Sequence, residues 1–585
     1  MTVVGTAGHV DHGKSTLLQA ITGRDPDRWE EEKRRGLTID LGFAWTVLPS
    51  GREVSFVDVP GHERFIKNML AGIEAIDVAL FVVAADEGWM PQSEEHLAVL
   101  DLLGVERGVV ALTKVDRVDD ELEELAGLEI LEHLEGTSLE GAPVVGVSAQ
   151  EGRGLEELVA ALDAAVADPE PGHDPRLWVD RRFTVAGAGT VVTGTLLGGP
   201  LEVGDTLVVH PGGEPVRIRT LQSHERAADR VEPHRRVAAS LVGAPEELAR
   251  GHMLGVAERW SLTSRFTAAV RTARYVEEEL GERGAYQIHA GTAAVGARLR
   301  SVGEGTLVTL ERPLPLRYGD RFIVRETGRR AVVGGGTVLD PRPPARGRPL
   351  RASAALPPGL HPREAASALL RVRGSEMASR LEAEAGAAPD AGISIQDWVF
   401  TADEMERLEE KATEELEAFH RATPLRPGLP LATLASRLGV TPEVVVSVIE
   451  RSSALEGDGT LVWAAGHRVT LTEEQEERWQ RARSALAGAG LAVPRAAELP
   501  IDEEMVHELV RSGDLVRVSG EILYLPEQAE EIRRAVAAMP EGFTVADFRD
   551  ALGLSRKYAV PILEWADETG LTRRRGDTRT PLSRE

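Results

Sequence analysis

The feature that most constrains the fold is an eight-residue loop near the start of the chain, Gly8–Ser15. Its sequence, Gly-His-Val-Asp-His-Gly-Lys-Ser, fits G-x-x-x-x-G-K-[ST], a loop whose backbone amides surround nucleotide phosphates between a strand and a helix. Only six of the 67 basic residues are lysine, and one of them, Lys14, stands where a compact ammonium suits the β- and γ-phosphates. The loop therefore predicts an α/β domain that hydrolyses a nucleotide.

Length and composition limit the class of protein. A chain of 585 residues exceeds the roughly 250–300 residues at which single cores stop growing, so we expect several domains. No apolar run approaches the roughly 18 residues that cross a bilayer, and a strand predicted at 2–6 leaves no room for a signal peptide. The absence of cysteine excludes disulfides and cysteine-ligated zinc. We expect a cytoplasmic monomer with no membrane partner.

The formal net charge of −27 argues against a nucleic-acid partner until its distribution is considered. Residues 1–170 hold 34 acidic and 13 basic side chains, whereas residues 176–259 hold 10 acidic and 11 basic ones. Residues 571–584 contain five arginines and one aspartate. Because the acidity is concentrated in the first part of the chain, the later parts remain open to binding a polyanion.

The pattern of apolar residues changes twice along the chain. Over 1–170 short apolar strands alternate with helices, which predicts a parallel-sheet α/β domain. Alternating strands between Gly- and Pro-rich turns then predict two antiparallel β-barrels, at 176–260 and 261–340. The Pro-, Arg- and Gly-rich stretch 341–351 is typical of a linker. Short helices with small hairpins predict an α+β tail of four winged-helix modules, at 355–419, 420–466, 467–526 and 527–585.

A second motif, Asp58-Val-Pro-Gly-His62, directly follows a predicted strand. A carboxylate at the end of a strand suits the ligand shell of Mg²⁺, to which the Ser15 hydroxyl would also contribute. Gly61 allows a backbone amide to approach the γ-phosphate. We expect His62 to be the catalytic residue, because an imidazole beside the γ-phosphate can hold the attacking water in line.

A third motif, Thr113-Lys-Val-Asp116, follows another predicted strand and selects the base. Asp116 can accept both N1–H and N2–H of guanine, while the Lys114 stem lies across the base and the Ser148-Ala149 backbone approaches O6. The nucleotide is therefore GTP, with GDP as product, and the first domain is a P-loop GTPase domain. The predicted GTP-binding residues are Asp11, His12, Gly13, Lys14, Ser15, Thr16, Asp58, Gly61, Thr113, Lys114, Asp116, Ser148 and Ala149.

These motifs, together with Arg35-Gly-Leu-Thr38-Ile, resemble those of the translational GTPases. The resemblance implies that Thr38 joins Ser15 and Asp58 as a Mg²⁺ ligand when the γ-phosphate is present. The chain departs from the pattern at Thr113, where many GTPases have Asn. One contact that braces the phosphate loop is therefore expected to be shorter or lost, whereas guanine specificity rests on Asp116.

Other segments resemble the bacterial selenocysteine-specific elongation factors (SelB type). They include the stretch Asp27–Phe43, which ends in Thr-Ile-Asp-Leu-Gly-Phe, and the stretch Val179–Gly194. Leu360–Glu364, Pro424–Gly428 and Phe548–Ala559 are similar to the winged-helix region of that family. The resemblance covers nearly the whole chain. It implies a translation elongation factor that delivers selenocysteyl-tRNA to a ribosome paused at a UGA codon marked by an mRNA hairpin.

The resemblance also implies an aminoacyl pocket on the first barrel, formed by Asp180, Arg181 and Arg236. A selenol has a low pKa, so selenocysteine is an anion where serine and cysteine esters are largely neutral, and guanidinium groups discriminate by charge. The residues alone show only two pairs of cations, Arg181-Arg182 and Arg235-Arg236, on a barrel near charge balance.

The end of the chain carries the predicted mRNA-binding residues. Residues 555–565 have the pattern of a recognition helix, in which Pro561 predicts a kink or a later start. A basic turn then follows, typical of a wing, and arginine contacts RNA hairpins both through phosphates and by stacking on splayed bases. The predicted mRNA-binding residues are Arg556, Lys557, Arg573, Arg574 and Arg575.

Three alternatives compete with this interpretation. A general elongation or initiation GTPase carrying ordinary aminoacyl-tRNA, and a GTPase subunit of sulfate activation, should both lack the long tail after residue 340. A GTP-regulated protein whose winged helices bind DNA is a different class. The basic wing alone does not exclude it.

Overall fold

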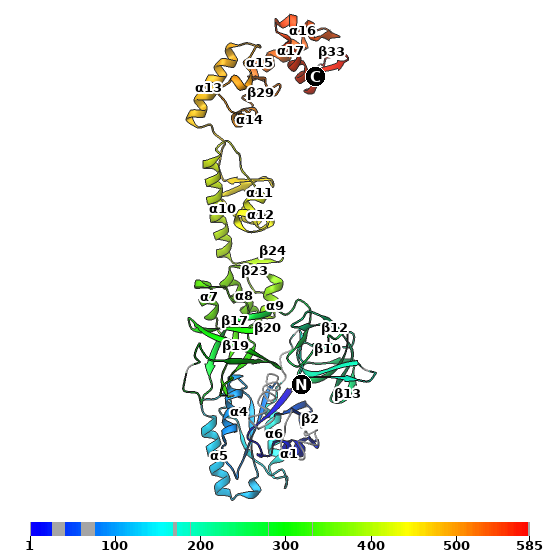
Figure 1. Cartoon of the computed structure of the whole chain (residues 1–585), viewed down its shortest axis with the longest axis vertical. Coiled ribbons are helices and arrows are strands. Elements are labelled where there is room, and N and C mark those ends of the chain that lie inside the picture. The colour runs from blue at the N-terminus through cyan, green and yellow to red at the C-terminus, as the bar shows by residue number, and fades with distance from the viewer. Residues whose placement is uncertain are drawn as a thin grey trace. The chain divides into compact units, whose positions relative to one another are not determined.

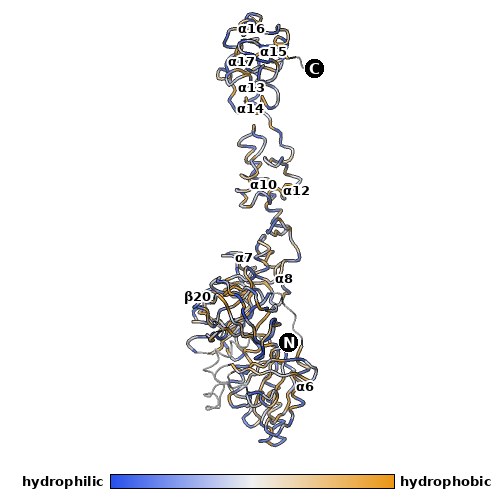
Figure 2. The backbone as a smooth tube through the Cα atoms, turned by 90° about the vertical axis from the view of Figure 1, so that its right-hand side faces the viewer, coloured by the Kyte–Doolittle hydropathy of each residue, from blue (hydrophilic) through white to orange (hydrophobic). Residues whose placement is uncertain are grey.

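The computed structural model describes residues 2–25, 41–59, 76–167, 172, 174–187, 189–278, 280–329 and 331–582. They form two compact units, Met1–Ala402 and Asp403–Glu585. Apolar residues are distributed through both units (Figure 2), and each unit has hydrophobic cores of its own.

The first domain of unit 1 is a six-stranded sheet of order β2-β3-β1-β4-β5-β6 (Figure 1). Its strands are β1 (Thr2–Ala7), β2 (Gly42–Val47), β3 (Glu53–Asp58), β4 (Val78–Ala84), β5 (Gly108–Thr113) and β6 (Val144–Gly146). The described helices are α1 (Lys14–Thr22), α4 (Pro91–Leu102), the 3₁₀ turn η2 (Val115–Arg117), α5 (Asp120–Leu134) and α6 (Leu155–Ala165). All neighbours are parallel except β2, which is antiparallel to β3. Since β1, β4 and β5 are fully buried, as helices on both faces of a sheet require, the predicted α/β domain is confirmed.

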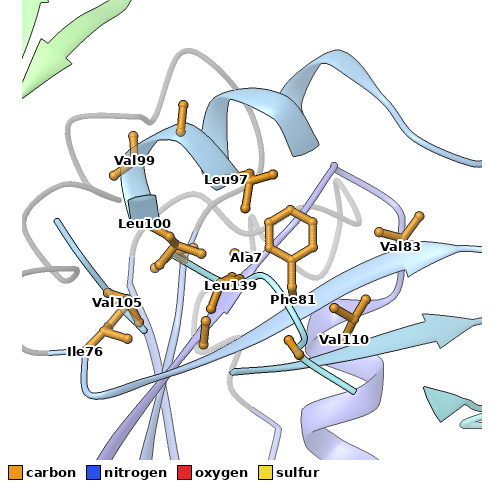
Figure 3. Close-up of a cluster of buried hydrophobic side chains, with 14 of the residues drawn as sticks. Ala7, Ile76, Phe81, Val83, Leu97, Val99, Leu100, Val105, Val110 and Leu139 are labelled. Atoms are coloured by element: carbon orange, nitrogen blue, oxygen red, sulfur yellow. The ribbon is translucent and has the colours of Figure 1, made fainter. Parts of the chain in front are cut away.

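A core of this domain packs α4 onto the sheet (Figure 3). Phe81 of β4 and Val110 of β5 belong to the same buried cluster as Leu97 and Leu100 of α4, and none of these four side chains exposes surface. This packing fixes α4 relative to the loop that follows β1.

Two antiparallel barrels follow, as predicted. The first contains β7 (Pro175–Trp178), β8 (Arg181–Val185), β9 (Gly189–Gly198), β10 (Leu201–Glu202), β11 (Thr206–His210), β12 (Pro215–Ser223), β13 (Arg226–Ala228), β14 (Arg230–Val231), β15 (Arg235–Val242) and β16 (Met253–Gly255). The pairing of β11 with β12 closes the strands β11-β16-β7-β9-β15-β12 into a ring, to which β13 and β8 are attached. The second is a closed barrel of β17 (Leu262–Thr272), β18 (Tyr286–Ala290), β19 (Ala293–Val302), β20 (Gly305–Pro315), β21 (Arg321–Glu326) and β22 (Val332–Asp340).

The stretch 341–351, predicted to be a linker, contains the start of a helix, α7 (Gly347–Ala354). Leu350 and Ala354 of α7 are buried with Val302 and Leu307 of the second barrel. The linker prediction was therefore wrong for residues 347–351. The helix is ordered by its packing against the second barrel, and the local sequence gives no sign of that contact. The first winged-helix module then consists of α8 (Pro362–Arg373), β23 (Ser375–Met377), α9 (Ala378–Ala385), β24 (Ile393–Ile395) and β25 (Trp398–Phe400).

Unit 2 contains three further modules of short helices and hairpins. The first has α10 (Ala402–Ala422), β26 (Leu429–Pro430), α11 (Leu431–Leu438), α12 (Pro442–Arg451), β27 (Leu455–Gly457) and β28 (Leu461–Ala464). The second has α13 (Glu473–Gly488), η3 (Ala496–Glu498), α14 (Glu503–Arg511), β29 (Val516–Arg517) and β30 (Leu523–Tyr524). The third has α15 (Pro526–Ala537), β31 (Phe543–Thr544), α16 (Val545–Leu552), α17 (Arg556–Glu568), β32 (Thr572–Arg575) and β33 (Thr578–Pro581).

In the tail, one predicted boundary needs correction and one of two alternatives is excluded. The predicted boundary between 355–419 and 420–466 falls inside α10, because its buried residues Met405, Leu408, Ala412, Leu416 and His420 keep helical spacing across it. The helix α17 begins at Arg556 and continues through Pro561, so the later start is not observed.

In the described ranges, no single helix is long and apolar enough to cross a membrane. Among the described helices, only α11 and α12 meet that length and composition test together, as a pair bent by 97°.

Candidate functional site

The phosphate loop joins β1 to α1 through backbone conformations that require glycine. Gly8 has φ +128°, and a Cβ there would lie 2.1 Å from the carbonyl oxygen of Val82. Gly13, at φ +87°, precedes α1, and no side chain caps this helix. The first amides of α1 therefore point to the place where a phosphate would bind. The loop also contains Asp11, at φ +63°, and buried His12, while Thr16 lies in the first turn of α1.

Lys14 lies across the loop. Its Nζ donates to the carbonyl oxygens of Gly8, at 3.0 Å, and His9, at 2.6 Å, and the residue is 6% exposed. These contacts hold the ammonium inside the loop, where it would meet the β- and γ-phosphates.

Asp58, at the end of β3, joins the predicted metal ligands. It is fully buried and accepts hydrogen bonds from Thr6 Oγ1, at 2.6 Å, and Ser15 Oγ, at 2.8 Å. A hydroxyl and a carboxylate are oxygen donors of the kind that Mg²⁺ prefers, so these side chains fit the ion. Thr38, Gly61 and His62 lie outside the described residues.

Thr113 keeps the brace that its replacement of Asn put in doubt. Its Oγ1 lies 2.7 Å from the carbonyl oxygen of His12 in the phosphate loop, and 3.3 Å from that of Val83. Since a hydroxyl has one proton, the shorter contact is the principal hydrogen bond. The brace is retained, through a different chemical group.

The guanine-motif residues lie at the ends of β5 and β6. Lys114 has φ +59°, and its Nζ pairs with Asp86, at 3.3 Å, and Glu87, at 2.5 Å. A hydrogen bond with the Ser148 side chain lowers the pKa of exposed Asp116, so the carboxylate is ionised, as acceptance of two guanine protons requires. Ala149 follows Ser148, whose amide bonds to the Arg153 carbonyl.

Sequence reasoning missed two residues of α4 that hold the phosphate loop. Gln92 Oε1 accepts from the amide of Val10, at 3.1 Å, and His96 Nδ1 accepts from the amide of Gly8, at 3.0 Å. Residues four apart share one face of a helix. A polar pair with this spacing is visible in the sequence, but nothing there indicates which loop it reaches.

Two buried histidines, His12 in the phosphate loop and His96 of α4 beside it, are neutral. Burial, assisted by the charge of Lys14, lowers the pKa of His96 to about 3. Burial likewise lowers the pKa of His12 to about 4. A neutral His96 is needed, because only a deprotonated Nδ1 can accept from the Gly8 amide.

The three residues expected to form the aminoacyl pocket lie together on the first barrel. Arg236 forms a two-pronged ion pair with Asp180, in which Nη2 lies 3.0 Å from Oδ1, and Thr193 Oγ1 donates to the same oxygen at 2.6 Å. Burial opposes ionisation of Asp180, but the Arg236 guanidinium and the Thr193 hydroxyl lower its pKa on balance. Asp180 is therefore a carboxylate.

Both pocket arginines also reach the GTPase domain. The Arg236 guanidinium lies 3.5 Å above the Phe43 ring, and Arg181 Nη2 donates to the carbonyl oxygen of Leu41 at 3.0 Å. A cavity of about 210 Å³ lies at this interface, lined by Phe43, Arg236, Phe183 and other residues of β2, β3 and the first barrel.

The basic residues at the chain end are exposed on one module. Arg573, Arg574 and Arg575 lie on β32, which turns at Gly576 into β33. Arg556 and Lys557 begin α17 and are also exposed. The same module places Arg579 inside, where it pairs with Asp567 at 2.9 Å and supports the hairpin.

Comparisons with known proteins agree with this arrangement. Three family models match: the Elongation factor Tu GTP binding domain over 1–168, the beta-barrel domain of Selenocysteine-specific elongation factor over 264–345, and the winged helix of Elongation factor SelB over 534–580.

Individual relatives and a solved structure match this chain over nearly its whole length. Selenocysteine-specific elongation factors are 35% identical in Desulfomicrobium baculatum, over 99% of both chains, and 33% in Escherichia coli K12, over 98% of both. Translation initiation factor 2 subunit gamma of Thermococcus kodakarensis is 32% identical over 58% of this chain and 97% of its own. A crystal structure of bacterial selenocysteine-specific elongation factor EF-Sec matches with TM-score 0.72 and 27% identity over all of both chains.

The Thr113 brace predicts a difference between two substitutions. Thr113→Val leaves the His12 carbonyl without its hydrogen bond, a loss of about 1–3 kcal/mol, so the Kd for GDP should rise about tenfold. Thr113→Ser keeps the hydroxyl and should stay within about threefold of the original chain. Titration with a fluorescent GDP analogue measures both. Equal affinity for the two variants would contradict the brace.

His96 predicts how stability depends on pH. Its folded pKa lies below its unfolded value, so the unfolded chain binds more protons between about pH 3 and 6.5, and stability falls as the pH falls through that window. From pH 7 to 5 the loss from His96 should be about 2 kcal/mol. His96→Asn keeps an acceptor but does not titrate, so it should lose about 2 kcal/mol less. The opening free energies of β1 amides, from hydrogen exchange, test this; equal losses would show that His96 is not held neutral.

Proposed function

The chain belongs to the selenocysteine-specific elongation factors, which are translational GTPases, and on that premise we propose that it carries selenocysteyl-tRNA to the ribosome at UGA codons marked by an mRNA hairpin. The observation that carries this proposal is the arginine cluster Asp180–Arg181–Arg236 at the interface with the GTPase domain. The long tail also supports the proposal. The selenocysteine-specific relatives match 98–99% of this chain, tail included, whereas the initiation-factor relative matches only 58% of it.

The protein hydrolyses GTP, and the described residues suggest how it prepares the nucleotide. Lys14 and the amides that open α1 would hold the phosphates, while Asp116 would select guanine. Ser15 and Asp58, with Thr38, would hold Mg²⁺, which neutralises charge on the β- and γ-phosphates. We assign His62 the positioning of the attacking water. Hydrolysis would then be slow until the ribosome completes the site.

The proposed pocket would choose its aminoacyl group by charge. A selenolate is an anion at neutral pH, whereas the serine hydroxyl is neutral. The guanidinium groups therefore stabilise bound selenocysteine by charge but give no such stabilisation to serine. Arg181 and Arg236 are partly shielded from water, which strengthens an ionic contact compared with the open surface.

This proposal predicts a preference between two charged forms of the same tRNA. The GTP-bound protein should bind selenocysteyl-tRNA about 100-fold or more tightly than seryl-tRNA, equivalent to about 2.7 kcal/mol. Arg181→Gln should reduce that ratio about tenfold, because one cation is lost from the pocket. Arg182→Gln is the matched control: it is the adjacent, exposed arginine of β8, on the opposite side of the strand, and should leave the ratio unchanged. Equal binding of the two tRNAs by the original chain would refute charge selection.

We further propose that the C-terminal module binds the mRNA hairpin through its basic hairpin and the start of α17. Exposed arginines suit a folded RNA, whose loop bases and phosphates are both accessible to a guanidinium. A DNA-binding winged helix remains the competing class, and the same residues would then recognise a duplex.

Replacing Arg573, Arg574 and Arg575 by Ala together should weaken binding of the cognate mRNA hairpin at least tenfold and reduce the salt slope by about 2 to 3. The matched control replaces three exposed arginines of another module, Arg421, Arg426 and Arg437, which changes the net charge equally. It should alter affinity less than threefold. Displacement of the RNA by equimolar duplex DNA would favour the DNA-binding alternative.

A further inference from the structure

We propose that Phe43 couples the nucleotide site to the aminoacyl pocket, as a positioning residue for Arg236; this inference rests on the proposed binding of selenocysteyl-tRNA. Phe43 is not one of the predicted nucleotide-binding residues, but it packs in the same buried cluster as Val57 and Val59, on either side of Asp58. Its significance comes from what lies on each side of it.

On the pocket side, Phe43 supports Arg236 without consuming its hydrogen-bond donors. The centre of the Phe43 ring lies 3.5 Å from the central carbon of the Arg236 guanidinium, and 5.9 Å from that of Arg181. A cation–π contact uses the face of the guanidinium, so N–H groups at its edge still reach Asp180 and can reach an anion. Phe43 is 9% exposed, and a contact this shielded from water is stronger than one at the surface.

Arg181 is tied to the same short stretch of chain. Its Nη2 donates to the carbonyl oxygen of Leu41 at 3.0 Å, two residues before Phe43. Both cations of the proposed pocket are thus placed by residues 41–43 of the GTPase domain, as well as by the barrel that carries them.

On the nucleotide side, the same stretch is paired with the end of β3. The register of β2 and β3 sets Gly42 opposite Asp58 and Phe43 opposite Val57. Directly opposed residues in an antiparallel pair have Cα atoms about 4.5–5.5 Å apart. Gly42, which separates the two arginine-holding residues, is therefore the cross-strand neighbour of the carboxylate that bonds to Ser15 and Thr6.

The end of β3 is the part of the sheet whose contacts depend on the nucleotide. A cation or phosphate bound between Ser15 and Asp58 competes with the 2.8 Å hydrogen bond that joins their side chains. An adjustment of Asp58 passes to Gly42 through the strand pairing, and then to the Phe43 ring and the Leu41 carbonyl. The guanidinium positions in the pocket respond, so the two ligands influence each other's binding through this strand.

Coupling of this kind is measurable as a ratio. Let the coupling ratio be the Kd for selenocysteyl-tRNA with GDP divided by the Kd with a non-hydrolysable GTP analogue. Because linkage is reciprocal, selenocysteyl-tRNA must change the relative affinity for the two nucleotides by the same factor. A residue with a merely structural role would weaken binding in both nucleotide states and leave this ratio unchanged.

The test compares three variants of the full chain. Phe43→Leu keeps an apolar side chain but removes the π face, and should lower the coupling ratio at least tenfold. Phe43→Tyr keeps the ring and should preserve the ratio within about threefold. Trp45→Leu is the matched control. It lies on the same face of β2 at the same interface, but it stacks on His224, with ring centroids 4.9 Å apart, and should leave the ratio unchanged.

The outcomes separate this inference from the proposed function. If Phe43→Leu retains the ratio of the original chain, or if Trp45→Leu lowers it equally, Phe43 is not the coupling residue although selenocysteyl-tRNA binds. If the original chain binds selenocysteyl-tRNA no better than seryl-tRNA, the proposed function itself fails. GTP and GDP affinities without tRNA should stay within about threefold in all three variants, and a larger loss in Phe43→Leu alone would also overturn the proposal.

Discussion

The hydrogen bonds accepted by Asp58 are the contact on which the functional geometry depends. They join β1, through Thr6, and α1, through Ser15, to the end of β3. A buried carboxylate without such donors would be strongly destabilising, so the hydroxyls at both positions are part of the fold as well as of the site. The phosphate loop lies between these two contacts and is supported from the other side by Gln92 and His96 of α4.

The barrels approach the GTPase domain at two separate places. The first barrel contacts β2, where Arg236 lies over Phe43, while the second contacts the end of α4 through an ion pair of Arg271 with Asp101 at 3.1 Å. The barrels are themselves locked together by Arg176, which pairs with Asp320 at 2.7 and 3.0 Å. Such a buried pair fixes geometry more reliably than it adds stability. The surface of the first barrel that contacts β2 is therefore held in place when β2 shifts at the edge of the nucleotide site.

The parts predictable from sequence were those with a local physical signature. The phosphate loop and the meeting of Ser15 with Asp58 follow from motifs placed at the carboxyl ends of parallel strands. The ion pair of Asp180 with Arg236, by contrast, joins residues far apart in the sequence and was expected only through family resemblance. The contact of Phe43 with Arg236 and that of His96 with the Gly8 amide were missed altogether. Each depends on a contact with a distant segment, and no periodicity or spacing encodes such a contact.

The charges of the proposed pocket suggest how it would match one ligand. The carboxylate of Asp180 cancels one of the two guanidinium charges, since it is held ionised by Arg236. Two guanidinium groups and one carboxylate give the side chains of Asp180, Arg181 and Arg236 a formal sum of one positive charge. A selenolate brings one negative charge, so the complex is balanced, whereas serine leaves the cationic excess facing an apolar ring at reduced solvation. Two arginines without a neighbouring carboxylate would attract any anion, phosphate included. In the proposed pocket, partial neutralisation by Asp180 would thus favour a small monoanion, and selectivity would follow from matching charge as much as from supplying it.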